Sequence, residues 1–220
     1  MDLNILILKL EESLIDRRDI PKLRGYIADK YPQYVELHNH TEDRGYKYGY
    51  PVIQYKVIDK TPALIAINEA CNLLMKVSFE LNNINIGSKA IDINEKKYIM
   101  KKEKFGISKE LIDYVFISPW MALNQDNYRK YLSFHKTEKD NLLKKIVIGN
   151  VLSMSKSLSY SVEEEIKTEI DLEPCKVNYK NQTMIAFKGN FKTNFHIPDY
   201  LGLGKSVSRG FGTVKQIKAV

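Results

Sequence analysis

The chain has 220 residues, a mass of 25.5 kDa and a formal net charge of +7. Hydrophobic residues make up 44% and charged residues 28%, which are the proportions of a folded globular protein and exclude a disordered chain, a collagen and a coiled coil. Its apolar runs fall far short of the roughly 18 residues that a membrane helix needs, and acidic Asp2 stands where a signal peptide is basic. We therefore expect a cytoplasmic protein without a membrane partner.

The first hundred residues predict alternating strands and helices. Leu3, Ile5 and Ile7 share one face of an expected strand over 2–9. Asp19, as a capping acid, and Pro21 open a helix that ends before residue 32. Strands within 46–57 and 61–67 are expected to form a hairpin, and another strand is expected within 89–100. Between them, a helix capped by Asn68 has the apolar stripe Ala70, Leu73, Leu74, Val77 and Leu81.

The second half predicts a similar series. A strand over 114–123 precedes a helix whose apolar face consists of Leu143, Val147, Val151, Met154 and Leu158. Strands over 166–177 and 183–195 follow, then a glycine-rich loop and a closing strand over 213–220. The expected fold class is α+β, with two ferredoxin-like (RRM-like) β-α-β-β-α-β domains in tandem at residues 1–104 and 105–220.

The excess of positive over negative charge is confined to the end of the chain. From Cys175 onward there is one acid, Asp199, against eight basic residues: Lys176, Lys180, Lys188, Lys192, Lys205, Arg209, Lys215 and Lys218. The preceding 174 residues are neutral overall. Such a basic segment predicts a polyanionic partner, although a solvated surface without a partner has the same composition. Cys71 and Cys175 lack the spacing of a zinc knuckle or a disulfide framework, so we expect reduced core residues.

Four of the eleven glycines fall in the run GLGKSVSRGFG at residues 202–212, called the glycine-rich loop below. Asp199 and Val207 stand where a P-loop and a dinucleotide loop would need glycine, so neither nucleotide motif is present. The piece RGFGTV resembles the strand signature of RNA recognition motifs. The loop is therefore predicted to hold an RNA phosphate backbone, although a plain corner between two strands is the alternative. Its predicted RNA-binding residues are Gly202, Gly204, Lys205, Ser206, Ser208, Arg209, Gly210, Phe211 and Gly212, with Phe211 either stacking on a base or entering the core.

His38 and His40 are two of only four histidines. In an extended backbone, residues two apart point the same way, and two imidazoles near their usual pKa of about 6.5 suit a general base and a general acid. Ribose cleavage needs that pair, since one group deprotonates a 2′-hydroxyl and the other protonates the leaving 5′-oxygen. Candidate supporting groups are Lys30 as a cation and Tyr46 or Tyr48 as hydrogen-bond donors.

The histidine pair has two alternative interpretations. It is an ordinary pair of loop histidines, or it is half of a zinc site. No third ligand with suitable spacing is evident, because Glu42 and Asp43 fall in an expected turn. We therefore expect no metal and no cofactor.

Two segments together, LHNHTEDRGYKYGYPVIQYK and GLGKSVSRGFGTV, resemble the CRISPR repeat-processing endoribonucleases of the Cas6 family. The likeness is greatest to a short archaeal and clostridial branch that carries an early histidine pair, here within the letters HNH. It implies two ferredoxin-like domains and a metal-independent cut within each repeat of precursor CRISPR RNA, which leaves 2′,3′-cyclic phosphate and 5′-hydroxyl ends.

By position, the resemblance implies that His38 and His40 are catalytic and that the glycine-rich loop positions RNA. The implied partner is CRISPR repeat RNA. Subunits of a CRISPR effector complex and a second copy of this chain are the protein partners that the resemblance leaves open. The competing hypothesis is a non-catalytic RNA-binding subunit of an effector complex, and a zinc-dependent hydrolase is a third.

Overall fold

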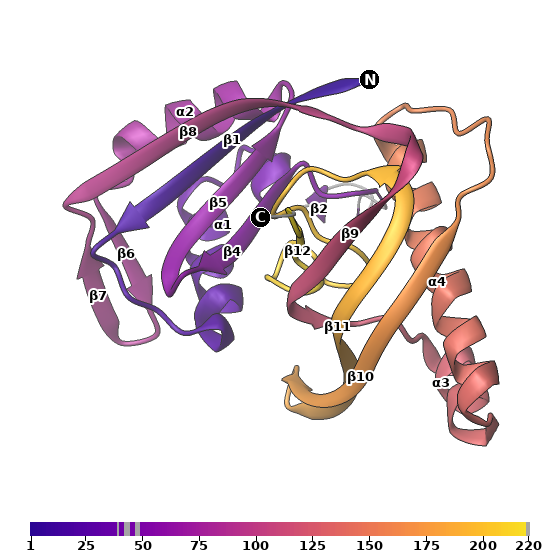
Figure 1. The fold of residues 1–220 in the computed structure, drawn as a ribbon. Helices are drawn as coiled ribbons and strands as arrows, with labels where there is room; N and C mark the ends of the chain where they lie inside the picture. Colours follow the sequence, from indigo (N-terminus) through magenta and orange to yellow (C-terminus); the bar gives the residue numbers. More distant parts are fainter. Residues whose placement is uncertain (39, 42–44, 47–48, 219–220) are drawn as a thin grey trace. The chain divides into compact units, whose positions relative to one another are not determined.

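A computed structural model gives the structure of residues 1–38, 40–41, 45–46 and 49–218, with the backbone alone for residues 40, 41, 45 and 46. The fold is α+β, and the chain divides into two compact units (Figure 1). The N-terminal unit consists of Asp2–Glu103 and Val207–Gly210. The C-terminal unit consists of Met1, Lys104–Ser206 and Phe211–Val220. A short piece of the glycine-rich loop thus packs with the first unit.

The N-terminal unit is built on a four-stranded sheet in the order β4-β5-β1-β8. Its main elements are β1 (Asp2–Glu11), α1 (Ile20–Lys30), β4 (Ile53–Ile58), β5 (Thr61–Ile67), α2 (Ala70–Glu80) and β8 (Glu95–Lys104). Its smaller elements are η1 (Arg17–Asp19), η2 (Val35–Leu37) and the hairpins β2 (His40–Thr41) with β3 (Gly45–Tyr46) and β6 (Asn83–Ile86) with β7 (Lys89–Asp92). β5 runs antiparallel to both β4 and β1.

Helices α1 and α2 cover one face of this sheet (Figure 1). The predicted α2 stripe is largely confirmed, because Ala70, Leu74, Val77 and Leu81 are buried in the core while Leu73 is only partly buried. From α1, the apolar residues Ile20, Leu23 and Ile27 enter the same core. The sheet contributes alternate residues such as Leu6 and Leu8, as expected where successive side chains of a strand point to opposite faces.

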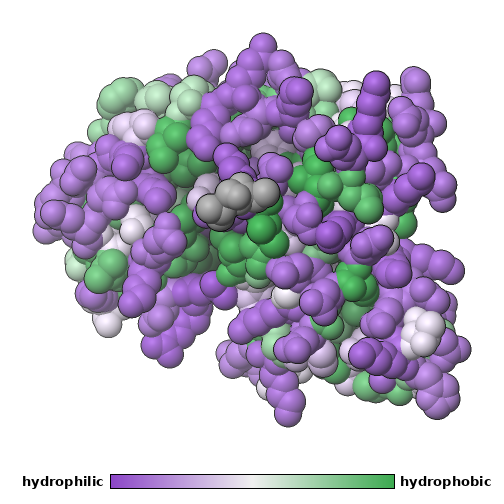
Figure 2. Space-filling model, viewed as in Figure 1, coloured by the Kyte–Doolittle hydropathy of each residue, from purple (hydrophilic) through white to green (hydrophobic). Residues whose placement is uncertain are grey.

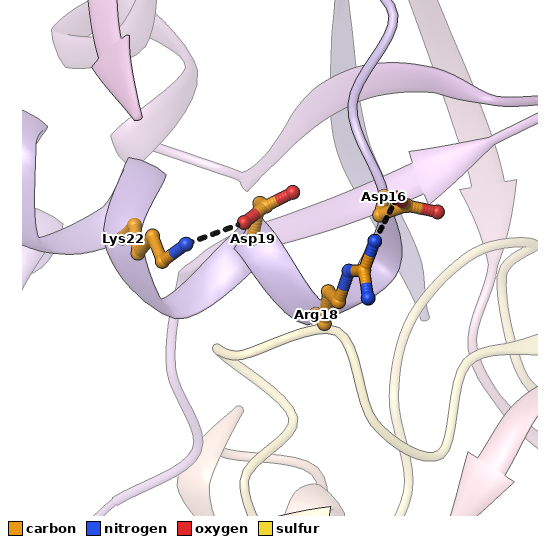
Figure 3. A network of polar contacts seen from close by, with 4 residues as sticks. All are labelled: Asp16, Arg18, Asp19 and Lys22. Carbon is orange, nitrogen blue, oxygen red and sulfur yellow. Dashed lines mark hydrogen bonds and ion pairs between the residues drawn. The ribbon is translucent and has the colours of Figure 1, made fainter. Parts of the chain in front are cut away.

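The two helix caps that the sequence predicted are wrong in detail. Asp19 occupies the N-cap position of α1 but caps no backbone N–H, and its carboxylate accepts from the Lys22 ammonium at 2.8 Å (Figure 3). A second surface pair, Arg18 with Asp16 at 3.0 Å, lies in the preceding turn (Figure 3). Asn68 has a positive φ of 51° and its side-chain oxygen accepts from the Asn4 backbone N–H at 3.0 Å, so it links β1 to the chain before α2.

Two predicted strand boundaries also differ. The run over 89–100 forms two strands, since β7 pairs with β6 and β8 joins the main sheet. The hairpin predicted from residue 46 begins at Ile53, because Tyr46 lies in β3 and pairs with His40. Local strand propensity indicated extended chain at both places but carried no information on the pairing partner.

The C-terminal unit has a second four-stranded sheet, in the order β10-β11-β9-β12. Its elements are β9 (Gly106–Trp120), α3 (Gln125–Ser133), α4 (Lys136–Ser157), β10 (Thr168–Tyr179), β11 (Gln182–His196) and β12 (Val214–Gln216). The predicted long helix is confirmed as α4, and its five apolar stripe residues are all buried. Helix α3 was not predicted, although Asn124 caps it by accepting from the Asn127 N–H at 2.7 Å.

An aromatic cluster forms the core of this unit. Phe116 stacks on Trp120 with ring centroids 5.2 Å apart, and Phe187 packs against Trp120 at 5.9 Å. The Trp120 indole N–H donates to the Asn150 side chain of α4 at 3.1 Å. The ring cluster and this bond fix α4 against the sheet, because a buried indole needs both apolar contact and an acceptor.

The six-element order predicted for the second half is wrong at its second helix. Residues 197–213, all of them described, contain no helix between β11 and β12. Gly204, Gly210 and Gly212 have φ values of 85°, 84° and 60°, in the left-handed region that a helix does not use. The segment therefore connects the two strands as an irregular loop. The closing strand is correspondingly short, with β12 ending at Gln216.

No helix in the described part of the chain is long and apolar enough to cross a membrane. Hydrophilic residues cover most of the face shown in Figure 2. Both cysteines are free; Cys71 is buried and Cys175 is half-buried, so the expectation of a core residue holds for the first alone.

Candidate functional site

His38 lies directly after η2, and the fold of the N-terminal unit fixes its backbone. Its carbonyl accepts from the Arg24 guanidinium of α1, and the preceding carbonyl, of Leu37, accepts from the buried Tyr55 hydroxyl of β4 at 3.0 Å. The Leu37 side chain is itself buried. Contacts from α1 and β4 thus hold the segment in place. The half-buried His38 side chain therefore extends from a fixed backbone.

The His38 ring contacts the chain that follows α1. Its Nε2 lies 3.2 Å from the Pro32 carbonyl oxygen, which can only accept, so Nε2 carries the hydrogen in this contact. In the neutral ring, Nδ1 is then the nitrogen with a lone pair. The contact with Pro32 thus sets the tautomer of the neutral ring.

The extended backbone that sequence analysis assumed at His38 is absent. The residue has φ −132° and ψ −10°, so the two-residue alternation of a strand does not start there. His40 begins β2 and pairs with Tyr46 of β3, which brings two predicted site residues opposite each other in one hairpin. Tyr48 lies outside the described residues, as do the side chains of His40 and Tyr46, and convergence of the imidazoles stays a prediction.

Lys30 ends α1, and its ammonium donates to the Glu80 carbonyl of α2 at 3.4 Å. The same ammonium lies over the rings of Tyr26 and Tyr31, at 5.9 and 5.7 Å from their centroids. These contacts place Lys30 beside the C-terminal end of α2, where a helix carries partial negative charge.

The histidine pair is also half of a candidate zinc site. Among the side chains that the structure describes, no three of the types histidine, cysteine, aspartate and glutamate come close enough to hold a metal ion. The side chains of His40, Glu42 and Asp43 lie outside that set.

In the C-terminal unit, the glycine-rich loop is shaped by close backbone contacts. A β-carbon on Gly212 would lie 2.0 Å from the Leu203 carbonyl oxygen, and one on Gly204 would lie 2.6 Å from the Trp120 indole nitrogen. Leu203 N–H donates to the Gly212 carbonyl at 2.9 Å, and Gly202 bridges to Thr213. Glycine is thus needed at these positions because the chain makes a tight turn that packs against Trp120. Gly202 and Gly212 are buried.

Lys205 is the exposed residue in the portion of the glycine-rich loop that belongs to the C-terminal unit. Its backbone N–H donates to the Met121 carbonyl at 3.1 Å and its ammonium to the Leu123 carbonyl at 2.9 Å, and partial burial lowers the pKa of that ammonium. Ser206 is half-buried with φ 57°. Phe211 is half-buried as well, and its ring meets the Tyr179 ring edge-on at 5.9 Å. Phe211 therefore packs on a neighbouring aromatic ring and keeps part of its surface open.

In the N-terminal unit, Val207–Gly210 lies along the outer edge of β4. Tyr55 N–H donates to the Ser208 carbonyl at 3.4 Å, and Tyr55 also forms a parallel bridge with Arg209. Gly210 is buried, and a β-carbon there would lie 3.4 Å from the Tyr55 carbonyl oxygen. The segment thus adds a short pairing to an edge strand and leaves the Ser208 and Arg209 side chains half-buried.

Lys56 of β4, which was not predicted as a functional residue, anchors this segment. The side chain is 1% exposed, and its Nζ donates to the Val207 carbonyl at 3.0 Å. Burial lowers the pKa of Lys56 to about 7. A lysine within the hydrophobic β4 strand was the available signal, since lysine is rarely buried without a partner.

The interpretation of RGFGTV as an RNA-recognition strand is wrong. Arg209 makes an isolated bridge, and the regular strand begins only at Val214. The positive φ values of Gly210 and Gly212 exclude a continuous strand through the run. Composition alone could not separate a strand from a turn that uses the same glycines.

Comparisons with known proteins bear on the whole chain. Residues 1–104 match the Cas6b N-terminal domain, and residues 106–217 match the Cas6b C-terminal domain. A solved Cas6b structure is 41% identical with a TM-score of 0.94, covering 99% of this chain and 100% of its own. A second, described as a CRISPR RNA processing endoribonuclease, is 37% identical with a TM-score of 0.81 and covers the same shares. A type IV Cas6 endonuclease with 10% identity and a TM-score of 0.56 has the same fold.

These two sheet-rich units therefore have the fold of Cas6 nucleases. The chain belongs to the Cas6b family of endoribonucleases. An uncharacterized protein of Methanocaldococcus jannaschii is 48% identical over 120 residues, which are 54% of this chain and 82% of that protein.

Proposed function

We propose that the protein cuts precursor CRISPR RNA within its repeats. The observation that carries this proposal is family membership over both halves of the chain, together with a solved relative described as a CRISPR RNA processing endoribonuclease. The net positive charge, which lies entirely within the last 46 residues, supports an RNA substrate. The early histidine pair supports placement in the archaeal and clostridial branch of the family.

The proposed reaction needs no metal. One histidine of the pair His38 and His40 removes the proton of a 2′-hydroxyl, and that oxygen attacks the adjacent phosphorus. The bond from phosphorus to the 5′-oxygen breaks, and the other histidine gives its proton to the leaving oxygen. The products are a 2′,3′-cyclic phosphate and a 5′-hydroxyl. Lys30, Tyr46 and Tyr48 are the proposed stabilisers of charge on the phosphorane.

The roles of the two histidines are separable with a substrate that carries a 5′-thio leaving group, because a thiolate departs without an acid. That substrate should restore cleavage in the variant that lacks the acid and not in the variant that lacks the base. The rescued variant, His38→Ala or His40→Ala, thus identifies the acid.

RNA binding is proposed for Lys205, Ser206, Ser208, Arg209 and Phe211, whose side chains are exposed or half-buried. The buried Gly202, Gly210 and Gly212, with Gly204, contribute the backbone shape that presents them. A loop of this kind offers N–H donors and cations to phosphates without reading bases.

We also propose that both units are ferredoxin-like domains, divided near residue 104. Their four-stranded sheets support this, since the strands of each sheet, counted along the chain, lie in the order second, third, first and fourth. The match of separate Cas6b domains to residues 1–104 and 106–217 supports the same division.

The decisive experiment is incubation with the host's repeat RNA in EDTA, followed by analysis of the fragment ends. We expect cleavage with cyclic phosphate ends. A single 2′-deoxy nucleotide before the cut should abolish cleavage and preserve binding. A requirement for divalent ions would replace this mechanism with metal-activated water, and binding without any cleavage would favour the non-catalytic subunit.

A further inference from the structure

The C-terminal unit contains a pocket between α3, the β10–β11 hairpin and Lys205, with a volume of about 580 Å³. That volume lies in the range of about 300 to 1,000 Å³ typical of small-ligand sites. It is formed by residues of one unit and does not involve the histidine segment. The pocket is therefore a feature separate from the proposed cleavage chemistry.

The pocket is cationic. Lys176 of β10 and Lys205 line it, and the ten lining residues, all described, include no aspartate or glutamate. The Leu123 carbonyl holds the Lys205 ammonium at 2.9 Å, and an ammonium has three donors, so one bond to a carbonyl leaves donors for an anion. Because no aspartate or glutamate among the lining residues offsets the two lysines, the pocket favours a ligand that carries a phosphate.

The rest of the lining suits a nucleobase. Tyr128 of α3 lines the pocket with a side chain that is 41% exposed, so its ring is available for stacking. Gln125 and Gln182 add side-chain amides, which can donate to and accept from a base edge. Met184 and Ile185 supply apolar surface. An aromatic ring, amides and lysines together are the chemistry that recognises a nucleotide.

The α3 residues of the pocket are held in place. Asn124 caps α3 through the Asn127 N–H at 2.7 Å, and the Tyr128 N–H donates to the Asn124 carbonyl at 2.8 Å. Tyr128 thus stands in the first turn of a capped helix. A preformed site loses less conformational entropy on binding than a flexible one.

We propose that this pocket binds one unpaired nucleotide of the RNA, away from the cut, with its base on Tyr128 and its phosphate at Lys176 and Lys205. The inference rests on the proposed function, because an RNA substrate delivers such a nucleotide, and Lys205 belongs to the loop proposed to bind RNA. A free mononucleotide has the same chemistry and is distinguished by experiment.

The test is an abasic scan. The affinity of wild type and Tyr128→Ala is measured by fluorescence anisotropy for repeat RNAs that each lack one base and carry a 2′-deoxy nucleotide at the cut. For wild type, one or two neighbouring abasic positions should weaken binding by about 5- to 150-fold, the usual value of one stacked base. The same positions should have no effect on Tyr128→Ala, and Tyr128→Phe should behave as wild type.

Lys176→Ala should lower the magnitude of the salt slope by about 0.7. Its matched control is Lys188→Ala, an exposed lysine on the neighbouring strand outside the pocket, which should keep the wild-type abasic profile. An unchanged affinity and abasic profile in Tyr128→Ala would overturn the proposal.

The second arm uses free nucleoside monophosphates and thermal stability. If they stabilise wild type and not Tyr128→Ala, while the abasic profile is flat, the pocket is a mononucleotide site and the RNA assignment is wrong. Cleavage of all-ribose repeat RNA by wild type is measured separately. Failure of the proposed function is therefore distinct from failure of the pocket.

Discussion

The four-stranded sheets of the two units have their strands in the same order, but the units differ in the connections between these strands. In the N-terminal unit, the chain reaches its last strand through α2, whose apolar side fills the core. In the C-terminal unit, the equivalent connection is the stretch 197–213, which has no helix and contains the glycine-rich loop. One connection adds buried apolar surface, while the other presents backbone groups and cations.

The connection that leads from the helix after the first sheet strand to the second sheet strand shows the opposite contrast between the units. Between α1 and β4, residues 31–52 include the histidine pair, whereas residues 158–167 between α4 and β10 include no histidine. Each unit thus has one plain connection and one that carries the candidate functional residues. A similar sheet can therefore support different tasks, because the sheet positions whatever its connections present.

The largest expected effect concerns the histidine connection. His38→Ala and His40→Ala should each slow single-turnover cleavage by roughly 100- to 10,000-fold, the usual contribution of a positioned acid or base, with little change in RNA affinity. The wild-type rate should form a bell against pH, and each variant should lose one limb. The double variant should reduce the cleavage rate by a much smaller factor than the product of the two single reductions, because the two residues act as a unit.

The controls are His135→Ala and His196→Ala, which should cleave nearly normally. Near-normal rates for both His38→Ala and His40→Ala would make these residues ordinary loop histidines and favour the binding subunit.

The plain connection should matter for stability instead. Leu74→Ala removes a fully buried α2 side chain and should lower the free energy of unfolding by about 2 to 5 kcal/mol in urea titration. Phe79→Ala, at a ring 70% exposed on the same helix, should change it by less than about 0.5 kcal/mol. Equal losses in both variants would show that α2 is not packed as described.

Lys56, which anchors Val207–Gly210, should make the free energy of unfolding depend on pH. The pKa of Lys56 falls from 10.5 to about 7 on burial, so between these values the unfolded chain binds more protons than the folded one. The free energy of unfolding should therefore rise as pH increases from about 7 toward 10.5, by on the order of 1 to 4 kcal/mol.

Lys56→Met should remove this rise, which unfolding in urea at several pH values would measure. The exposed Lys145→Met is the control and should keep it. An unchanged pH profile in Lys56→Met would exclude Lys56 as its source.

The glycine-rich connection should tolerate no β-carbon at its tightest point. Gly212→Ala places one 2.0 Å from the Leu203 carbonyl at a φ of 60°, which should cost about 1 to 3 kcal/mol of stability and weaken RNA binding. Gly149→Ala in α4, where nothing lies within 4 Å, should stabilise by about 0.5 to 1 kcal/mol. Thermal unfolding compares the two, and a neutral Gly212→Ala would mean that the loop can relax.

The smallest effect is electrostatic. Replacing Lys205 and Arg209 together by alanine should lower the magnitude of the salt slope for RNA binding by about 0.7 per lost phosphate contact. Affinity measured over a range of salt concentrations gives the slope. If affinity and slope stay unchanged, the glycine-rich loop is only a structural corner.

The sequence by itself determined the parts of the fold that depend on local pattern. The spacing of Leu143, Val147 and Val151 predicted α4 because three to four residues make one helical turn. The β-branched and apolar run around the Asp59-Lys60 turn predicted the β4–β5 hairpin for a similarly local reason. Two motif segments likewise predicted the family.

Only the tertiary structure decided the partners of those elements. It placed Val207–Gly210 beside β4, anchored by a buried lysine 151 positions away in sequence. It also held the backbone of His38 through Arg24 and that of the preceding Leu37 through Tyr55. It also joined Tyr128, Lys176 and Lys205 in one pocket. Such contacts depend on how strands pair and helices dock over long separations, and a local pattern holds no record of which distant residue will fill a given space.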